Sequence, residues 1–158
     1  LGLSAFKEYE YIKTLTNEES ALFNLIIKGK ASLTLNKKDD DKIISVNIYS
    51  GKGKIEIKDS EVIYNIDALG EIKVNTTNIN LKDEKAYHKL NDEFKKILNE
   101  KLLKFIEVLK NDNLDILEVN NLYYEKTRKE MNIFKSFDFK LNTNIKIDKK
   151  GLIFNFEN

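Results

Sequence analysis

The sequence predicts an α+β fold, in which a mainly antiparallel β-sheet is packed by one long helix and two or more shorter helices. Two observations lead to this prediction. From about residue 31 to residue 74, apolar and polar residues alternate, which is the period of strands with one buried face. Between about Asp83 and Lys110 the apolar residues instead recur every three or four positions, which indicates one amphipathic helix.

The composition is that of a globular domain. Of the 158 residues, 41% are hydrophobic and 34% are charged, a composition that is sufficient to form a buried core. The chain is too short for two ordinary domains. We therefore expect one domain over residues 1–158. No stretch approaches the about 20 apolar residues that cross a bilayer. Because the chain opens on LGLSAF, already in a strand-like pattern, we interpret it as a domain of a longer protein.

The charge pattern argues against nucleic-acid binding. The formal net charge is only +1, acidic and basic residues are interleaved, and Arg128 is the only arginine. Nucleic-acid surfaces normally combine a basic excess with arginines that bind phosphates in a bidentate manner. Cysteine is absent, which excludes disulfides, thiolate metal ligands and a cysteine nucleophile.

The first thirty residues predict a strand over residues 4–15 followed by a short helix. Thr16 and Glu19 have the spacing of a capping box, in which each side chain accepts a hydrogen bond from a free backbone N–H at the helix start. The helix is expected to end near Gly29, since glycine suits the left-handed residue that follows many helices.

Strands are expected next at 31–35, 44–57 and 62–74, with turns at KKDDDK and KDSE between them. Gly51, Gly53 and Gly70 are expected to mark bulges or bends. The long helix then runs for about 28 residues, or roughly 40 Å, and ends at NDN. A second helix is expected at about 116–127, a short third one within MNIFKSF, and a closing hairpin of FDFKLNTNIKID, the turn KKG and LIFNF.

Asp115 is the residue on which an enzymatic interpretation would depend. Asp115 and Glu118 have the spacing of an N-cap residue and a residue in the first helical turn, where carboxylates are favoured. A general acid or base would need a partner within hydrogen-bonding reach, and the sequence offers none. We therefore interpret Asp115 as a helix cap.

The other candidate motifs also have simpler structural interpretations. His88 is the only histidine and lies on the polar side of the long helix. The DDD at 39–41 lacks the glycine and the closing glutamate of a calcium loop, and the GKGK at 51–54 lies between two strands rather than between a strand and a helix. We expect no catalytic residue, no metal site and no cofactor. The long helix could pack entirely on the sheet, or its lysine-rich face could dock a partner or an anionic membrane.

Three segments resemble the C-terminal domain of the Ger(x)C family of spore germination proteins. The first is LSAFKEYEYIKTLTNEESALFNLIIKGKASLTL, the second NDNLDILEVNNLYYEKTRKEM, and the third FDFKLNTNIKIDKKGLIFN. The family's positions are occupied here by Phe6, Leu15, Glu18, Glu19, Ser20, Gly29, Lys30, Asp115, Ile116, Leu117, Val119, Asn120 and Gly151. The chain departs from the pattern at Arg128 and Met131, near which relatives often have proline and tryptophan.

The resemblance implies a non-catalytic part of a nutrient germinant receptor. Proteins of this family are lipoproteins that work with the receptor's A- and B-type membrane subunits at the outer face of the spore inner membrane. Their lipid anchor would lie outside this chain, which would be the third domain. An alternative is an extracytoplasmic domain that binds the nutrient itself, and a third is an enzyme that acts on spore polymers, for which the catalytic residues are missing.

A protein-binding surface of such a domain is expected to carry exposed aromatic residues with charge around them. The candidates are Tyr123, Tyr124, Phe134 and Phe137, which lie between the helix that follows Asp115 and the closing hairpin. The alternative is that these aromatic residues only seal the edge of the core.

Overall fold

The computed structural model describes residues 3–7, 10–77 and 79–148, and it has the predicted α+β fold. Its elements are β1 (Ser4–Lys7), β2 (Glu10–Thr14), α1 (Asn17–Ile27), β3 (Lys30–Asp39), β4 (Lys42–Lys58), β5 (Glu61–Asn75), α2 (Glu84–Asn111), α3 (Val119–Thr127), α4 (Ile133–Ser136) and β6 (Asp138–Asp148). The turn and last strand of the predicted closing hairpin, with Gly151, lie outside the described residues.

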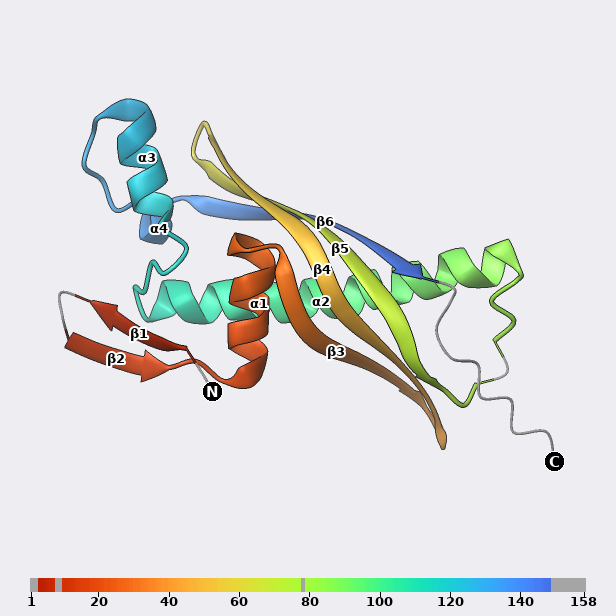
Figure 1. Cartoon of the computed structure of the whole chain (residues 1–158). Coiled ribbons are helices and arrows are strands. Elements are labelled where there is room, and N and C mark those ends of the chain that lie inside the picture. Colours follow the sequence, from red (N-terminus) through yellow and green to blue (C-terminus); the bar gives the residue numbers. More distant parts are fainter. Residues whose placement is uncertain (1–2, 8–9, 78, 149–158) are drawn as a thin grey trace.

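Four strands form the main sheet in the order β3–β4–β5–β6, and β1 pairs with β2 in a separate two-stranded sheet. The pairs β3–β4 and β4–β5 are antiparallel, which confirms the mainly antiparallel sheet, whereas β6 lies parallel to β5. A parallel neighbour requires a long connection, and here α2, α3 and α4 supply it. Figure 1 shows α2 crossing the strands on one side of the twisted sheet.

The core lies between α2 and the inward-facing residues of the sheet. The predicted stripe of α2 is buried, with Phe94, Leu98 and Leu102 fully enclosed against the sheet residues. The helix starts where the side chain of Asp83 accepts hydrogen bonds from the backbone N–H groups of Lys85 and Ala86. No helix in the described part of the chain is both long and apolar enough to cross a membrane.

The predicted continuous strand over residues 4–15 is wrong, because the segment is a hairpin. β1 pairs antiparallel with β2, and the register shifts between Ala5 and Phe6. Aromatic and aliphatic residues alternate on both sides of the reversal, so the pattern does not reveal it. The hairpin is held to the rest of the fold by Leu15, whose N–H donates to the carbonyl of Leu3, and by Ser20, whose hydroxyl accepts from the N–H of Leu3.

Helix α1 begins and ends as predicted. The N–H of Glu19 donates to Thr16 Oγ1 at 3.1 Å, and the N–H of Thr16 donates to the Glu19 carboxylate at 2.8 Å, which completes the capping box. Gly29 follows the C-cap residue Lys28 and has a φ of +63°. Its carbonyl accepts a hydrogen bond from the N–H of Gly51 at 2.9 Å, so the end of α1 is fastened to β4.

One of the three glycines expected at bulges, Gly70, lies at a bulge of the sheet, because it pairs with Ile48 where the register shifts, whereas the register does not shift at Gly51 or Gly53. The pairing of β4 with β5 shifts between Ile48 and Ser50, so Tyr49 is an extra residue on β4. The extra residue changes which positions face the core: Ile48 does so before it, and Gly51 and Gly53 do so after it. The register shifts a second time between Ser45 and Val46, which pair with Val74 and Ile72 of β5. Val74 is therefore turned outward and is 42% exposed, so the alternation of buried residues predicted for β5 ends before Val74.

Candidate partner surface

The connection from α2 to α3 is built around the carboxylate of Asp115. One of its oxygens accepts the N–H of Val119 at 2.9 Å and the other accepts the N–H of Asn120 at 2.7 Å. These are free backbone donors at the start of α3, so Asp115 caps this helix with both oxygens. The predicted helix start at residue 116 is nevertheless wrong, since α3 begins at Val119. Glu118 occupies the N-cap position in a left-handed conformation, with a φ of +57° and no side-chain bond to the helix.

Replacing Asp115 with asparagine is expected to lower the free energy of unfolding by about 1–3 kcal/mol, because the amide has one acceptor and would leave one partly buried N–H unpaired. At an ordinary N-cap, asparagine and aspartate are nearly equivalent. Chemical denaturation measures the difference. Asp92→Asn, on the exposed side of α2, is the matched control and should change stability by about 0.5 kcal/mol or less.

The same pair of proteins should also differ in their pH dependence. Burial raises the pKa of Asp115 above its ordinary value of 3.8 and outweighs the two backbone N–H groups, which lower it. The folded state therefore binds the proton more tightly, and the stabilisation from this group is lost as the pH rises through its folded pKa. The stability advantage of the natural protein over Asp115→Asn is expected to shrink as the pH rises above about 4, the ordinary pKa of the carboxyl group. An advantage that grows with pH would contradict this assignment.

Three asparagine side chains extend this cap to α4. The amide oxygen of Asn120 accepts the N–H of Phe134 at 2.9 Å, and its amide nitrogen donates to Asn132 at 3.3 Å. Asn132 in turn donates to the side chain of Asn113 at 3.0 Å and accepts the N–H of Lys135 at the start of α4. The network sets the position of α4, and with it the positions of the aromatic residues on either side. No local pattern in the sequence indicates the roles of Asn113 and Asn132, and Asn120 stands out there only as a position of the family pattern.

The four candidate aromatic residues differ in their surroundings. Phe134 is fully buried, so its place on a partner surface is ruled out and it belongs to the core. Tyr123 and Phe137 are half-buried and meet edge to face, with ring centroids 5.9 Å apart. Tyr124 is 41% exposed, and the guanidinium of Arg128 lies 6.0 Å from its ring. Of the four, Tyr124 is therefore the residue most available to a partner.

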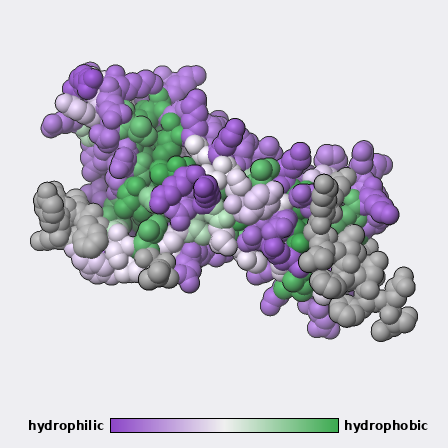
Figure 2. Space-filling model, in the orientation of Figure 1, coloured by the Kyte–Doolittle hydropathy of each residue, from purple (hydrophilic) through white to green (hydrophobic). Residues whose placement is uncertain are grey.

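A groove lies on another side of α3 from Tyr124, between α3 and the end of the β4–β5 hairpin. We call it the α3 groove; it has a volume of about 400 Å³ and is lined by Lys54, Ile55, Glu56, Ile57, Lys58, Leu122 and Lys126. Its apolar residues are contributed by both elements: Ile55 and Ile57 are half-buried, and Leu122 is 37% exposed. Figure 2 shows apolar surface in this region, bordered by hydrophilic residues.

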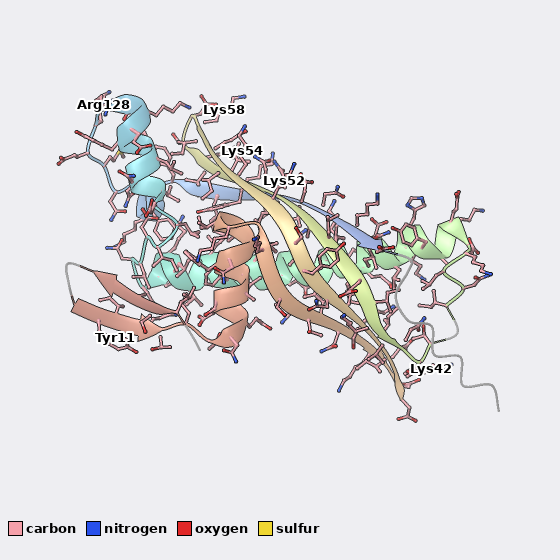
Figure 3. The ribbon with its side chains drawn as sticks, in the orientation of Figure 1. Tyr11, Lys42, Lys52, Lys54, Lys58 and Arg128 are labelled. Atoms are coloured by element: carbon pink, nitrogen blue, oxygen red, sulfur yellow. The ribbon has the colours of Figure 1, made fainter. Side chains whose placement is uncertain are left out.

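Basic side chains surround the α3 groove. Figure 3 shows Lys52, Lys54 and Lys58 following one another along β4 toward its tip, with Arg128 at the end of α3. The lining itself contains three lysines and one glutamate, Glu56, which pairs with Lys54 at 2.6 Å. The groove thus combines an apolar floor with a net positive rim. The groove is not apparent from the sequence, and its one signal there is Leu122, an apolar residue that α3 does not bury.

A second, larger hollow of about 500 Å³ lies where the β1–β2 hairpin meets the α2–α3 connection. Leu15 and Asp115 both line it, so the structure brings these two family positions together. Its polar lining includes Asn120 and Asn132. Their side chains, and the Asp115 carboxylate, form hydrogen bonds to other groups of the protein itself. The polar side of this hollow is therefore used to hold the fold together.

The remaining family positions lie in separate places. Glu18 pairs with Lys101 of α2 at 2.6 Å, and Glu19 completes the capping box and contacts Lys13 at 3.2 Å. Lys30 is exposed at the start of β3, and Phe6 lies in β1. These residues do not converge on one site. In residues 3–7, 10–77 and 79–148 there is also no group of three or more side chains suited to a metal ion, and His88 is exposed beside Tyr87.

The fold and the surface define an α+β domain that combines an apolar groove with a basic rim. Residues 1–151 match the family model described as "Spore germination B3/ GerAC like, C-terminal", and the chain belongs to this family. Among solved structures, the chain resembles the one titled "Crystal Structure of the GerBC protein", with a TM-score of 0.67 and 18% sequence identity over 88% of this chain. The match covers 48% of that protein, so the chain spans about half its length. A search of curated proteins finds no match.

Proposed function

We propose that this chain is the C-terminal domain of the C-type subunit of a nutrient germinant receptor, and that it acts in spore germination by contacting other proteins. The family membership supports the role in germination. The observation that carries the proposal of protein contact is the α3 groove, together with the exposed ring of Tyr124 on another side of the same helix. Exposed apolar and aromatic surface with a charged rim is typical of protein interfaces.

The partners proposed for this surface are the A- and B-type membrane subunits of the receptor, as the family resemblance implies. The domain would work at the outer face of the spore inner membrane, held there by a lipid anchor outside this chain, and without turnover of its own. A direct nutrient-binding role would need the hollow beside Leu15 and Asp115. Protein contact is preferred, because polar groups of that hollow already bond to the protein's own backbone and side chains.

Replacing Tyr124 with alanine in the full-length protein is expected to slow germination by about tenfold while leaving the unfolding midpoint unchanged, because an exposed aromatic anchor at an interface typically contributes more than 1 kcal/mol. Germination rates of spores and thermal unfolding of the chain measure the two effects. Tyr49→Ala is the matched control, since Tyr49 has a similar exposure of 43% but lies on the main sheet, away from α3.

A photo-cross-linking amino acid at the two tyrosine positions would identify the partner. Cross-links from position 124 to a membrane subunit, and none from position 49, are the expected result. Equal effects of the two substitutions on germination, or cross-links from position 49 alone, would contradict the proposal. A thermal-shift screen with amino acids, sugars and ions addresses the nutrient-binding alternative, which predicts stabilisation that is lost on altering the hollow beside Leu15.

A further inference from the structure

Strand β4 is longer than the strand that covers its outer edge. β3 pairs with β4 only as far as Lys30 and Ser50, whereas β4 continues to Lys58. From Lys52 to Lys58, β4 is paired with β5 on one side. On the other side, within the described part of the chain, no strand accompanies it. An uncovered strand edge presents backbone N–H and C=O groups that can pair with another chain.

Two hydrogen bonds show which residues of β4 direct their backbone groups toward this edge. The N–H of Gly51 donates to the carbonyl of Gly29, and the carbonyl of Ile57 accepts the ammonium group of Lys126 at 2.9 Å. In an antiparallel ladder, every second residue directs both groups to the same side. The N–H and C=O of Ile55 therefore face the same edge, where no strand of the described part of the chain pairs with β4.

The α3 groove lies along this uncovered edge. Ile55 and Ile57 extend their side chains into it, and Leu122 of α3 forms its other wall. Side chains of an added strand would alternate between the groove and the opposite face, because strands have a period of two. Apolar residues fit the groove positions. The intervening residues would lie beside Lys54 and Lys58, where acidic side chains fit the positive rim.

We infer that the β4 edge at Ile55 and Ile57 binds an extended segment of a partner protein, which adds to the sheet as an antiparallel strand in the position that β3 leaves open. The segment has alternating apolar and acidic residues. The inference rests on the proposed function, because it names the kind of partner that the domain's surface receives. A membrane surface would supply the negative charge but not the regular backbone donors and acceptors that this edge requires.

Lys126 has a specific part in this binding. Its ammonium group donates a hydrogen bond to the carbonyl of Ile57, the same acceptor to which the N–H of an added strand would donate. When the strand binds, its N–H replaces the ammonium group, and Lys126 becomes available to an acidic side chain of the segment. Lys126→Met is therefore expected to keep strand addition but to reduce the preference for acidic over neutral segments.

The test uses the 158-residue chain and an acetylated, amidated hexapeptide of alternating valine and glutamate. NMR is expected to show binding with slower hydrogen exchange of the Ile55 amide. Two peptide controls separate the causes. Methylation of the valine nitrogens removes the donors that an antiparallel strand directs at β4 and should abolish binding, and replacing glutamate with lysine should weaken it by about tenfold or more.

Matched variants of the protein complete the test. Leu122→Glu should abolish peptide binding, whereas Leu69→Glu should not, since Leu69 has a similar exposure of 41% but lies in β5 opposite Ser50 and does not line the groove. The inference is overturned if no peptide binds, if the N-methylated peptide binds equally well, or if the Ile55 amide is unaffected. If any of these occurs while Tyr124→Ala still slows germination, strand addition is wrong and the proposed function stands. If the peptide binds but Tyr124→Ala has no effect, the proposed function fails instead.

Discussion

Replacing Gly53 with alanine is expected to lower the free energy of unfolding by about 3 kcal/mol or more, because the new methyl group would overlap backbone that cannot move aside alone. A Cβ at this position would collide with the carbonyl oxygen of Ile26 and would lie 2.9 Å from Ile26 Cα. Relief would require α1 to withdraw from β4. That movement would open the core around Leu25 and break the hydrogen bond between Gly51 and Gly29.

Urea denaturation of the variant measures this loss, and two other substitutions calibrate it. Gly70→Ala should cost less, because its Cβ would meet side-chain atoms, at 2.7 Å from Val46 Cγ1 and 3.0 Å from Ile48 Cδ1. Lys52→Ala, next to Gly53 on the exposed face, should change stability by about 0.5 kcal/mol or less. A Gly53→Ala protein as stable as the Lys52→Ala protein would show that α1 does not rest on β4 in this way.

Replacing Phe134 with alanine is expected to lower the free energy of unfolding by about 3–5 kcal/mol, since the ring is fully enclosed and its removal leaves a cavity. Phe134 is also the second residue of α4, and its N–H donates to the amide oxygen of Asn120. Loss of the ring should therefore loosen α4 together with the core. Thermal or chemical unfolding monitored by circular dichroism measures the effect.

The neighbouring aromatic residues provide a graded comparison for this prediction. Phe137→Ala should be destabilising to a smaller extent, because Phe137 is half-buried against Tyr123, and Tyr124→Ala should be nearly neutral for stability. The expected order of the losses is thus Phe134, then Phe137, then Tyr124. A Tyr124→Ala protein as unstable as Phe134→Ala would mean that this tyrosine belongs to the core and would remove the support for a contact surface.

Much of the fold could be predicted from the sequence because its signals are local. The capping box at Thr16 and Glu19, the left-handed Gly29 and the stripe of α2 each depend on residues within a few positions of one another. The prediction failed where the same alternating pattern is compatible with two structures, either a continuous strand or a strand that is interrupted by a turn or a bulge. Alternating residues continue through the β1–β2 reversal, and Tyr49 changes the inward parity of β4 without any break in composition.

The candidate site was predictable only in part, for the same reason. The sequence predicted that Asp115 caps a helix. Its two hydrogen bonds, however, reach the N–H groups of Val119 and Asn120, four and five positions on, and not the positions two or three residues on that an ordinary N-cap contacts. Phe134 and Tyr124 have similar sequence surroundings, and only packing places one in the core and the other on the surface. The α3 groove combines residues of β4 with Leu122, more than sixty positions apart, and no local pattern links them.

By itself, the sequence determined the type and order of most of these elements, the absence of a nucleic-acid pattern and the family to which the chain belongs. Those features follow from local propensity, periodicity and spacing. Only the tertiary structure decided that β6 lies parallel to β5, that α1 rests on Gly53 and that β4 extends beyond β3. These features depend on which surfaces meet when the core is closed. An uncovered edge exists only relative to the strands around it, so it arises from packing and is not visible in the order of residues.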